Sequence, residues 1–186
     1  MEYPGATQRP GPAWKVWPTA NAIAGVILHS MEGAEAGAWS VLDGPLQASW
    51  HFSVMRDGRV FQHYPLDASP WHAGSRAQNV RLVGIEHEGQ AGEPLTDEQV
   101  QASLALVRWV ARQGGWRLER HTTLLEHNEV SSTQCPSGRI PWDRYEEEDE
   151  QAVQIRQLDT AETIQAVEAI ERQFSQIMFD NLGNTA

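Results

Sequence analysis

The feature that most constrains this chain is its single cysteine, Cys135, which lies eight residues after His127 in the segment H-N-E-V-S-S-T-Q-C-P-S-G. One cysteine cannot form a disulfide within the chain, so its thiol must serve packing, reactivity or metal binding. A thiolate near an imidazole is a donor pair that suits zinc. Such a site needs a third protein ligand and, if it is catalytic, an open position for water.

The chain's length and composition predict a globular protein made in the cytosol. Its 186 residues are enough for one compact domain with an appendage, and no apolar run approaches the roughly 20 residues of a membrane helix. The start, M-E-Y-P-G-A-T-Q-R-P, lacks the basic head and apolar run of a signal peptide. We therefore expect a cytoplasmic location, where the thiol stays reduced, and no membrane partner.

The negative charge is concentrated near the C-terminus. The formal net charge is −11, of which residues 143–186 contribute −8 through eleven acidic residues and three arginines. The rest of the chain carries only −3 and shows no basic stripe. This distribution argues against a nucleic-acid-binding protein.

Hydrophobic patterning predicts an α/β domain with a central mixed sheet flanked by helices. In chain order the predicted elements are a strand at 24–29, a short helix at 33–42, a hairpin at 50–63, a strand at 79–89, a helix at 96–114 and a strand at 122–126. Asp57-Gly58 supplies the hairpin turn, and Thr96 with Gln99 supplies a capping box for the long helix. Residues 1–22, rich in proline, glycine and alanine, are expected to form an extended lead-in.

The last forty residues differ in character from the rest. An acidic run occupies 146–150, and beyond it apolar residues recur at mostly three- and four-residue intervals, which predicts an amphipathic helix. The apolar stripe comprises Leu158, Ile164, Val167, Ile170, Phe174 and Ile177. We therefore divide the chain into a domain at 1–145 and an acidic helical extension at 146–186. The extension could pack on the domain or form a homo-oligomer.

Two histidines close predicted strands, which is where loops commonly build sites. His29 ends the strand at 24–29 and His127 follows the strand at 122–126, so the two imidazoles could meet if these strands are neighbours. Each histidine could equally be a hydrogen-bonded structural residue. His51 is expected to be structural, whereas His63 and His121 are expected at the surface.

Five segments in this order resemble the zinc-dependent N-acetylmuramoyl-L-alanine amidases, a family that includes phage lysozyme-type amidases and animal peptidoglycan recognition proteins. The segments are V-I-L-H-S (26–30), W-H-F-S-V-M-R-D-G-R-V-F-Q (50–62), S-P-W-H-A-G (69–74), V-G-I-E-H-E-G (83–89) and the cysteine segment at 127–138. The resemblance covers residues 24–145. It implies a zinc ion held by His29, His127 and Cys135, with the site at one end of the sheet.

The resemblance also implies a substrate and a general base. The substrate would be the amide between N-acetylmuramic acid and L-alanine in peptidoglycan or in a soluble muropeptide. Glu86 matches the family's catalytic glutamate, and its neighbours His87 and Glu88 are the local competitors. Strand alternation places 86 and 88 on one face and 87 on the other, so alternation alone leaves both glutamates open.

Two positions depart from parts of the family. Trp50 stands where one branch of the family has a tyrosine. An indole has no phenol group to titrate, so the proton transfer would fall to Glu86. Thr133 stands where many bacterial and phage members have a lysine, so a neutral hydroxyl would stabilise the oxyanion. We expect three residues to contact the substrate, namely Trp50 and, in S-P-W-H-A-G, Trp71 and His72.

The resulting hypothesis is a peptidoglycan amidase of the phage endolysin type. A cytosolic amidase that recycles muropeptides is an alternative, as is a non-catalytic peptidoglycan-binding protein. A third alternative is a regulator that binds a polymerase and has a closed structural zinc site. Such a site needs a fourth protein ligand, for which only His51 and His121 could be considered.

Overall fold

The computed structural model describes residues 1–145, 160 and 163–165. The chain divides into two units, Met1–Pro141 and Trp142–Ala186, and the elements named below belong to the first. In the second unit the described residues are helical. The acidic run and most of the predicted amphipathic helix lie outside the described residues. The division at 145/146 and the proposed self-association therefore stay predictions.

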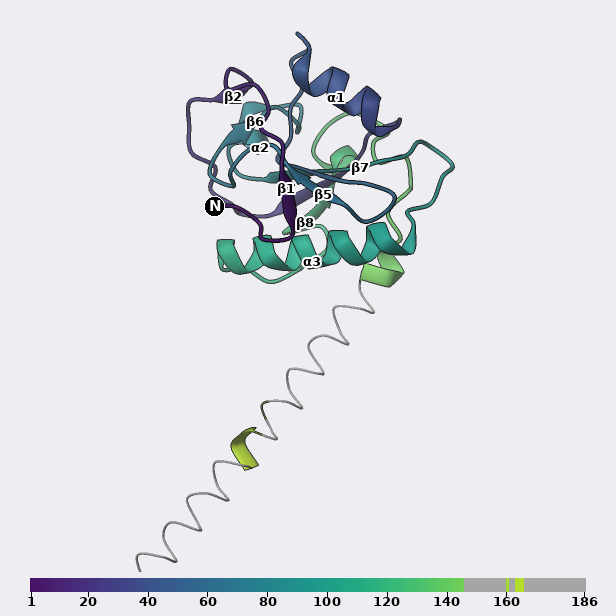
Figure 1. The fold of residues 1–186 in the computed structure, drawn as a ribbon. Helices are drawn as coiled ribbons and strands as arrows, with labels where there is room; N and C mark the ends of the chain where they lie inside the picture. The colour runs from purple at the N-terminus through teal and green to yellow at the C-terminus, as the bar shows by residue number, and fades with distance from the viewer. Residues whose placement is uncertain (146–159, 161–162, 166–186) are drawn as a thin grey trace, which may run out of the picture. The chain divides into compact units, whose positions relative to one another are not determined.

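A six-stranded mixed sheet forms the centre of the first unit (Figure 1). In spatial order its strands are β1 (Ala6–Gln8), β5 (Val60–Gln62), β4 (Phe52–Val54), β7 (Val83–His87), β3 (Val26–Ser30) and β8 (Leu124–Glu126). Only the β4–β5 hairpin is antiparallel, and Gly58 in its turn has φ +80°. A separate antiparallel pair joins β2 (Val16–Trp17) to β6 (Ser69–Pro70). The predicted mixed sheet and its hairpin are confirmed.

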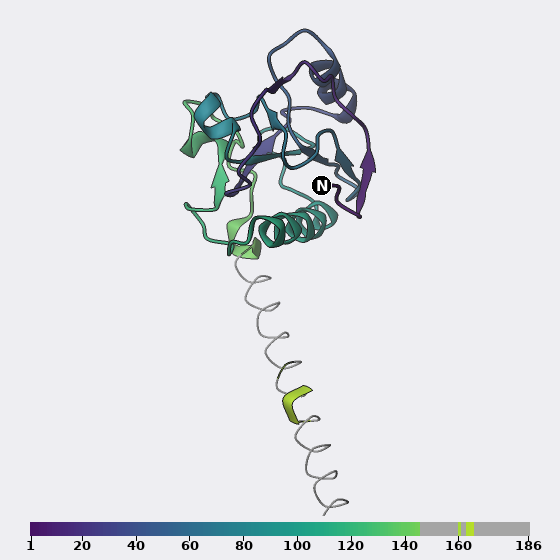
Figure 2. The same ribbon diagram turned by 90° about the vertical axis from the view of Figure 1, so that its left-hand side faces the viewer.

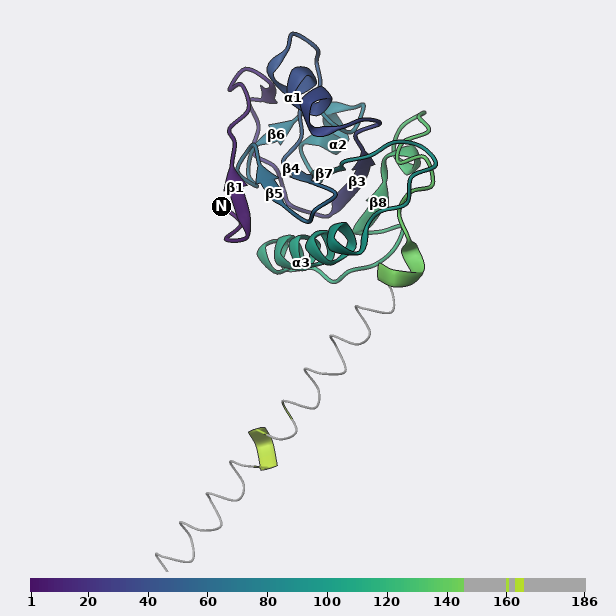
Figure 3. The same cartoon turned by 45° about the vertical axis from the view of Figure 1, so that its right-hand side comes forward.

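The helices cover the two faces of the sheet. The long helix α3 (Asp97–Gly114) lies along one face, while α1 (Glu35–Asp43) and the short α2 (Arg76–Asn79) lie on the other side (Figures 1, 2 and 3). The capping box of α3 is confirmed, because the Thr96 side chain accepts from Gln99 N and the Gln99 side chain accepts from Thr96 N. Within the described residues, no helix is both long and apolar enough to cross a membrane.

The central strand β3 is buried along its whole length. Val26, Ile27 and Leu28 are completely inaccessible, as expected for a parallel strand covered on both faces. Its neighbours β7 and β8 run parallel to it. The carboxyl ends of these three strands therefore lie side by side at one end of the sheet, which is where parallel sheets commonly carry their ligand sites.

Residues 1–22, expected to form an extended lead-in, also pair with other strands, which the sequence analysis did not predict. This segment supplies the edge strand β1, which runs parallel to β5, and the strand β2. The same segment covers His63, which is 3% exposed and not at the surface as predicted. His63 Nδ1 donates to the carbonyl of Arg9 at 2.8 Å, and its Nε2 contacts Ser53 Oγ at 2.8 Å. The strand pairing and the burial of His63 escaped prediction for one reason, because a pairing between segments about fifty residues apart leaves no local pattern.

Candidate active site

The register of three parallel strands brings the predicted site residues together. His29 on β3 is aligned with Glu86 on β7, so the two side chains lie on the same face of the sheet. Leu28 is aligned with Glu126 on β8, which places the next residue, His127, beside His29. The His29 and His127 rings lie 4.5 Å apart between centroids.

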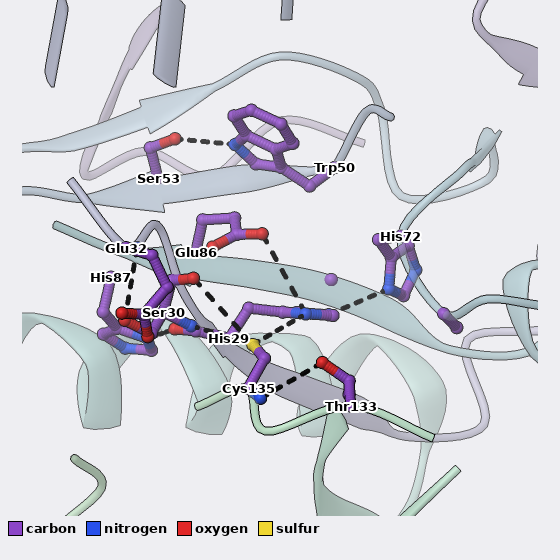
Figure 4. Close-up of polar contacts among 12 residues, drawn as sticks. His29, Ser30, Glu32, Trp50, Ser53, His72, Glu86, His87, Thr133 and Cys135 are labelled. Atoms are coloured by element: carbon purple, nitrogen blue, oxygen red, sulfur yellow. Dashed lines mark hydrogen bonds and ion pairs between the residues drawn. The ribbon is translucent and has the colours of Figure 1, made fainter. Parts of the chain in front are cut away.

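Cys135 completes the cluster from the loop that follows β8. The potential ligand atoms of His29, His127 and Cys135 all lie within 4.8 Å of one another. The separation of His29 Nδ1 and Cys135 Sγ is 3.8 Å, close to the roughly 3.6 Å expected for nitrogen and sulfur ligands of one tetrahedral zinc ion. Figure 4 shows the sulfur directed at the His29 ring. These three side chains can therefore hold a metal ion.

Two further observations fit a metal with an open position. The Nε2 atom of His127 is buried and has no hydrogen-bond partner among the described residues. No fourth ligand joins the cluster within the described part of the chain. His51 is buried and bonded to Gly84 N and to the carbonyl of Ala68, and His121 is exposed and paired with Glu129. Neither histidine supplies the closed cage that a structural site would need.

Glu86 faces the cluster, whereas its two competitors point elsewhere. Its Oε1 lies 3.9 Å from His29 Nδ1, and its Oε2 is buried with no partner among the described residues. His87 points to the opposite face, where its ring contacts Ser103 of α3. The Glu88 carboxylate accepts hydrogen bonds from the backbone N–H groups of Glu35 and Arg56. The geometry thus separates the two glutamates that alternation left open.

Burial sets the charge state of the cluster without metal. It lowers the pKa of His127 and holds the pKa of His29, which also faces other imidazoles, well below its ordinary value. Burial, with a smaller contribution from the Glu86 carboxylate, raises the pKa of the Cys135 thiol to about 12. The imidazoles are therefore neutral and ready to coordinate, whereas the thiol must release a proton when a metal binds.

A cavity of about 430 Å³ opens over this cluster. The first turns of α1 form one wall through Gly37, Ala38 and Val41, and Trp50 and Trp71 form another. Small side chains on the helix and indole rings opposite leave a largely apolar slot with the ligand cluster at its base. Such a mixture of apolar walls and a few convergent polar groups is typical of ligand sites.

The remaining predicted residues all border this cavity, but they differ in which polar atoms are left to contact a ligand. The Thr133 hydroxyl accepts from Cys135 N at 3.2 Å, which leaves its own hydrogen available as a donor. The Trp50 N–H donates to Ser53 Oγ, so only its ring faces the cavity. Both ring nitrogens of His72 are engaged inside the protein, by His29 and by the carbonyl of Leu82.

Two residues beside the cluster were missed by the sequence analysis. The backbone N–H of Ser30 donates to Cys135 Sγ at 3.3 Å, an interaction that favours the thiolate. Arg139 is 4% exposed and donates to Ser30 Oγ and to the carbonyls of His87 and Glu88. It therefore ties the cysteine loop to the ends of β3 and β7. The only feature of the sequence that could have pointed to Arg139 is its position directly after the cysteine segment.

Comparison with known proteins assigns the family. The family described as N-acetylmuramoyl-L-alanine amidase matches residues 19–138, which is most of the first unit. The chain belongs to this family. This match includes all three predicted ligands and both predicted catalytic residues.

Individual relatives agree with this assignment. N-acetylmuramoyl-L-alanine amidase A of Achromobacter lyticus is 32% identical over 99 residues, covering 51% of this chain and 55% of that protein. Endolysin 2638A of Staphylococcus phage 2638A is 28% identical over 125 residues, covering 61% of this chain and 26% of that protein. The chain thus spans about half or less of these relatives. The endolysin amidase LysCS from Clostridium intestinale URNW shares the fold, with a TM-score of 0.61 at 20% identity over 80% of this chain and 97% of that one.

The environment of Glu86 predicts a pH-dependent stability effect. Burial, together with the negative charge of Glu32, raises its pKa to about 8 from an ordinary 4.5. Because the folded state holds this proton more tightly than the unfolded state, ionisation destabilises the metal-free fold as the pH rises through this interval. We expect Glu86→Gln to stabilise the metal-free protein more at pH 8 than at pH 5, by on the order of 1–4 kcal/mol.

Urea unfolding in the presence of a chelator at the two pH values measures this difference. Glu88→Gln removes an equal charge from the end of the same strand and serves as the matched control, for which no gain at pH 8 is expected. The same difference between Glu86→Gln and wild type at both pH values would contradict the prediction.

Proposed function

We propose that the chain is a zinc-dependent amidase that hydrolyses the bond between N-acetylmuramic acid and L-alanine in bacterial peptidoglycan. The observation that carries this proposal is the His29, His127 and Cys135 cluster at the base of a cavity, with Glu86 facing it. The family assignment and the names of the relatives support the same reaction. Two imidazoles and a thiolate form a donor set that zinc takes readily.

The ligand set implies how water and substrate are activated. When bound with one open position, zinc lowers the pKa of a water ligand to roughly 7 and polarises the scissile carbonyl. No nucleophilic side chain is then required. Cys135 serves as a ligand, held by Ser30 N, and not as a nucleophile.

Glu86 is the residue best placed to move the proton. Its carboxylate lies on the cavity side of His29, within 3.9 Å of the nitrogen that faces the cluster. A buried carboxyl group with a raised pKa can take a proton from water and return it to the leaving amine near neutral pH. Trp50 cannot share this role, because an indole does not titrate and its N–H is bonded to Ser53.

The biological setting that we propose is a phage-type endolysin that acts on intact cell wall. The similarity to an endolysin supports this choice, and the substrate preference tests it. A recycling amidase would prefer soluble muropeptides to intact wall. A binding protein of the same fold would cleave neither substrate.

Digestion of purified sacculi tests the proposed reaction. The zinc-loaded protein should release new free L-alanine amino termini, detectable by mass, and a chelator should abolish the release until zinc is restored. Glu86→Gln should lose on the order of a hundredfold or more in kcat, because it cannot accept the proton. Glu88→Gln is the matched control and should stay active. New reducing sugar ends, or binding without release, would contradict the proposal.

The hydroxyl of Thr133 supplies a second test. We expect it to donate to the oxyanion, so Thr133→Ala should lower kcat on the order of ten- to a thousandfold, the range for one lost donor. Thr133→Ser keeps the hydroxyl and should retain most of the activity. Equal losses in the two variants, measured on a soluble muropeptide, would show that the hydroxyl does not contribute.

A further inference from the structure

A hydrogen-bonded chain leads from the sheet into the metal cluster. His72 Nε2 lies 3.1 Å from the carbonyl oxygen of Leu82, and His72 Nδ1 lies 3.1 Å from His29 Nε2. A carbonyl oxygen only accepts, so the proton of a neutral His72 must be on Nε2 and its Nδ1 must accept. His29 Nε2 then carries a proton, and the lone pair of His29 is left on Nδ1, the atom nearest Cys135 and Glu86.

The protein holds His72 firmly in this orientation. Asn79 Oδ1 accepts hydrogen bonds from the backbone N–H groups of His72 and Ala73, at 3.0 and 2.7 Å. Asn21 Nδ2 donates to the same Leu82 carbonyl at 2.9 Å. Gly84 on β7 provides the space, since a Cβ at this position would lie 2.5 Å from His72 Cγ. The ring is 7% exposed and therefore fixed by its neighbours.

We propose that His72 is a positioning residue that selects the His29 tautomer able to coordinate through Nδ1. This role differs from the substrate contact expected from the sequence, because both ring nitrogens of His72 are already engaged. A ligand histidine whose second nitrogen donates to a fixed acceptor is both oriented and made more basic. The inference rests on the metal site of the proposed function but not on the reaction catalysed there.

Zinc affinity and ring tautomers test this role without any assay of activity. His72→Leu removes the acceptor at similar volume and should weaken zinc binding about ten- to a hundredfold, measured by competition with a chelator. His72→Asn places an oxygen near the position of Nδ1 and should recover most of the affinity. His63→Leu, which removes another buried, doubly bonded histidine whose two hydrogen bonds go to Ser53 and Arg9 and not to a proposed ligand, should lose stability but keep its zinc affinity.

Long-range ¹H–¹⁵N spectra of the metal-free full chain report the tautomers directly. His29 and His72 should each carry their proton on Nε2 in the wild type, and His29 should lose this preference in His72→Leu. Wild-type zinc affinity in His72→Leu, or a proton on Nδ1 of His29 in the wild type, would overturn the proposal. Zinc binding with the expected pattern but no amidase activity would refute the proposed function alone.

A second inference concerns tryptophans outside the metal cluster. Trp14 is 56% exposed, and its ring lies 6.1 Å from that of Trp71, which lies equally far from Trp17. The Arg76 guanidinium lies 5.3 Å from the centre of the Trp17 ring. Trp14 and Trp17 precede residues 19–138, which match the family. The N-terminal segment thus adds two indoles to one supplied by the domain.

This aromatic cluster adjoins the cavity of the metal site. A smaller cavity of about 190 Å³ is lined by Trp17, Trp71, Gln47 and Arg76, among others. Trp71 borders both cavities, so the second one lies beside the metal site. The Arg76 guanidinium lies over one face of the Trp17 ring, and the indoles of Trp17 and Trp71 line the cavity together with the Gln47 amide. Apolar ring surface combined with an amide and a guanidinium suits a sugar ring, whose faces are apolar and whose rim carries hydroxyl groups.

We infer that the cavity lined by Trp17 and Trp71, extended by the exposed Trp14 that lies against Trp71, binds a sugar of the glycan chain adjacent to the muramoyl unit whose amide is cleaved. This inference deepens the proposed function, because it names a polymeric glycan as the preferred substrate. The alternative occupant, the stem peptide with a carboxylate on Arg76, is an outcome of the test.

Peptide-free glycan oligomers contain no scissile amide, so they test binding separately from catalysis. Tryptophan fluorescence of the zinc-loaded wild type should respond to these oligomers, and Trp14→Ala should weaken binding roughly three- to thirtyfold. Trp14→Phe should retain most of the affinity, and Trp109→Phe on α3 serves as a control for the loss of an indole. Absence of binding, an unchanged affinity in Trp14→Ala, or binding only of stem peptides would overturn this inference. Glycan binding without hydrolysis of sacculi would instead refute only the proposed reaction.

Discussion

The site depends on the register between β3 and its two parallel neighbours. His29 is aligned with Glu86, and Leu28 is aligned with Glu126, the residue before His127. The side chains of His29, Glu86 and His127 therefore meet at one end of the sheet without any long loop to place them. A shift of one residue in either pairing would turn a side chain to the α3 face, where His87 now lies. The buried apolar residues of β3 therefore fix the chemistry as well as the core.

Cys135 is the one proposed ligand that does not come from or directly follow a strand of this sheet. Its loop is held by polar contacts. The carbonyl of Cys135 accepts from Asn128 N, and Arg139 attaches the end of the loop to the strand ends. A buried guanidinium that donates to several carbonyls is rigid, because its planar group fixes all of them together. Its positive charge also lowers the pKa of Glu86 and interacts with Cys135, the two groups that would become anionic in the proposed mechanism. The same residue thus serves both geometry and electrostatics.

The parts of the fold that could be predicted are those with a local cause. The Asp57-Gly58 hairpin and the capping box at Thr96 depend on residues within a few positions of one another. The edge strand β1 and the burial of His63 could not be predicted, since both depend on pairing with a segment about fifty residues away. The ligand cluster lies between these cases. Motif resemblance predicted it and selected Glu86, whereas strand alternation alone left Glu86 and Glu88 open. The contacts of the two carboxylates in the fold favour the same choice.

The choice between Glu86 and Glu88 shows how the same residue type acquires opposite properties two positions apart. Glu88 is satisfied by two backbone N–H groups, so it serves structure. Glu86 has a buried oxygen with no partner among the described residues, and burial, together with the charge of Glu32, raises its pKa. An unsatisfied carboxyl group costs stability, and folds retain such groups mainly where the chemistry needs them. A bound cation and water would supply the missing partners and offset this cost, so the instability of Glu86 in the metal-free fold and its reactivity have a common origin.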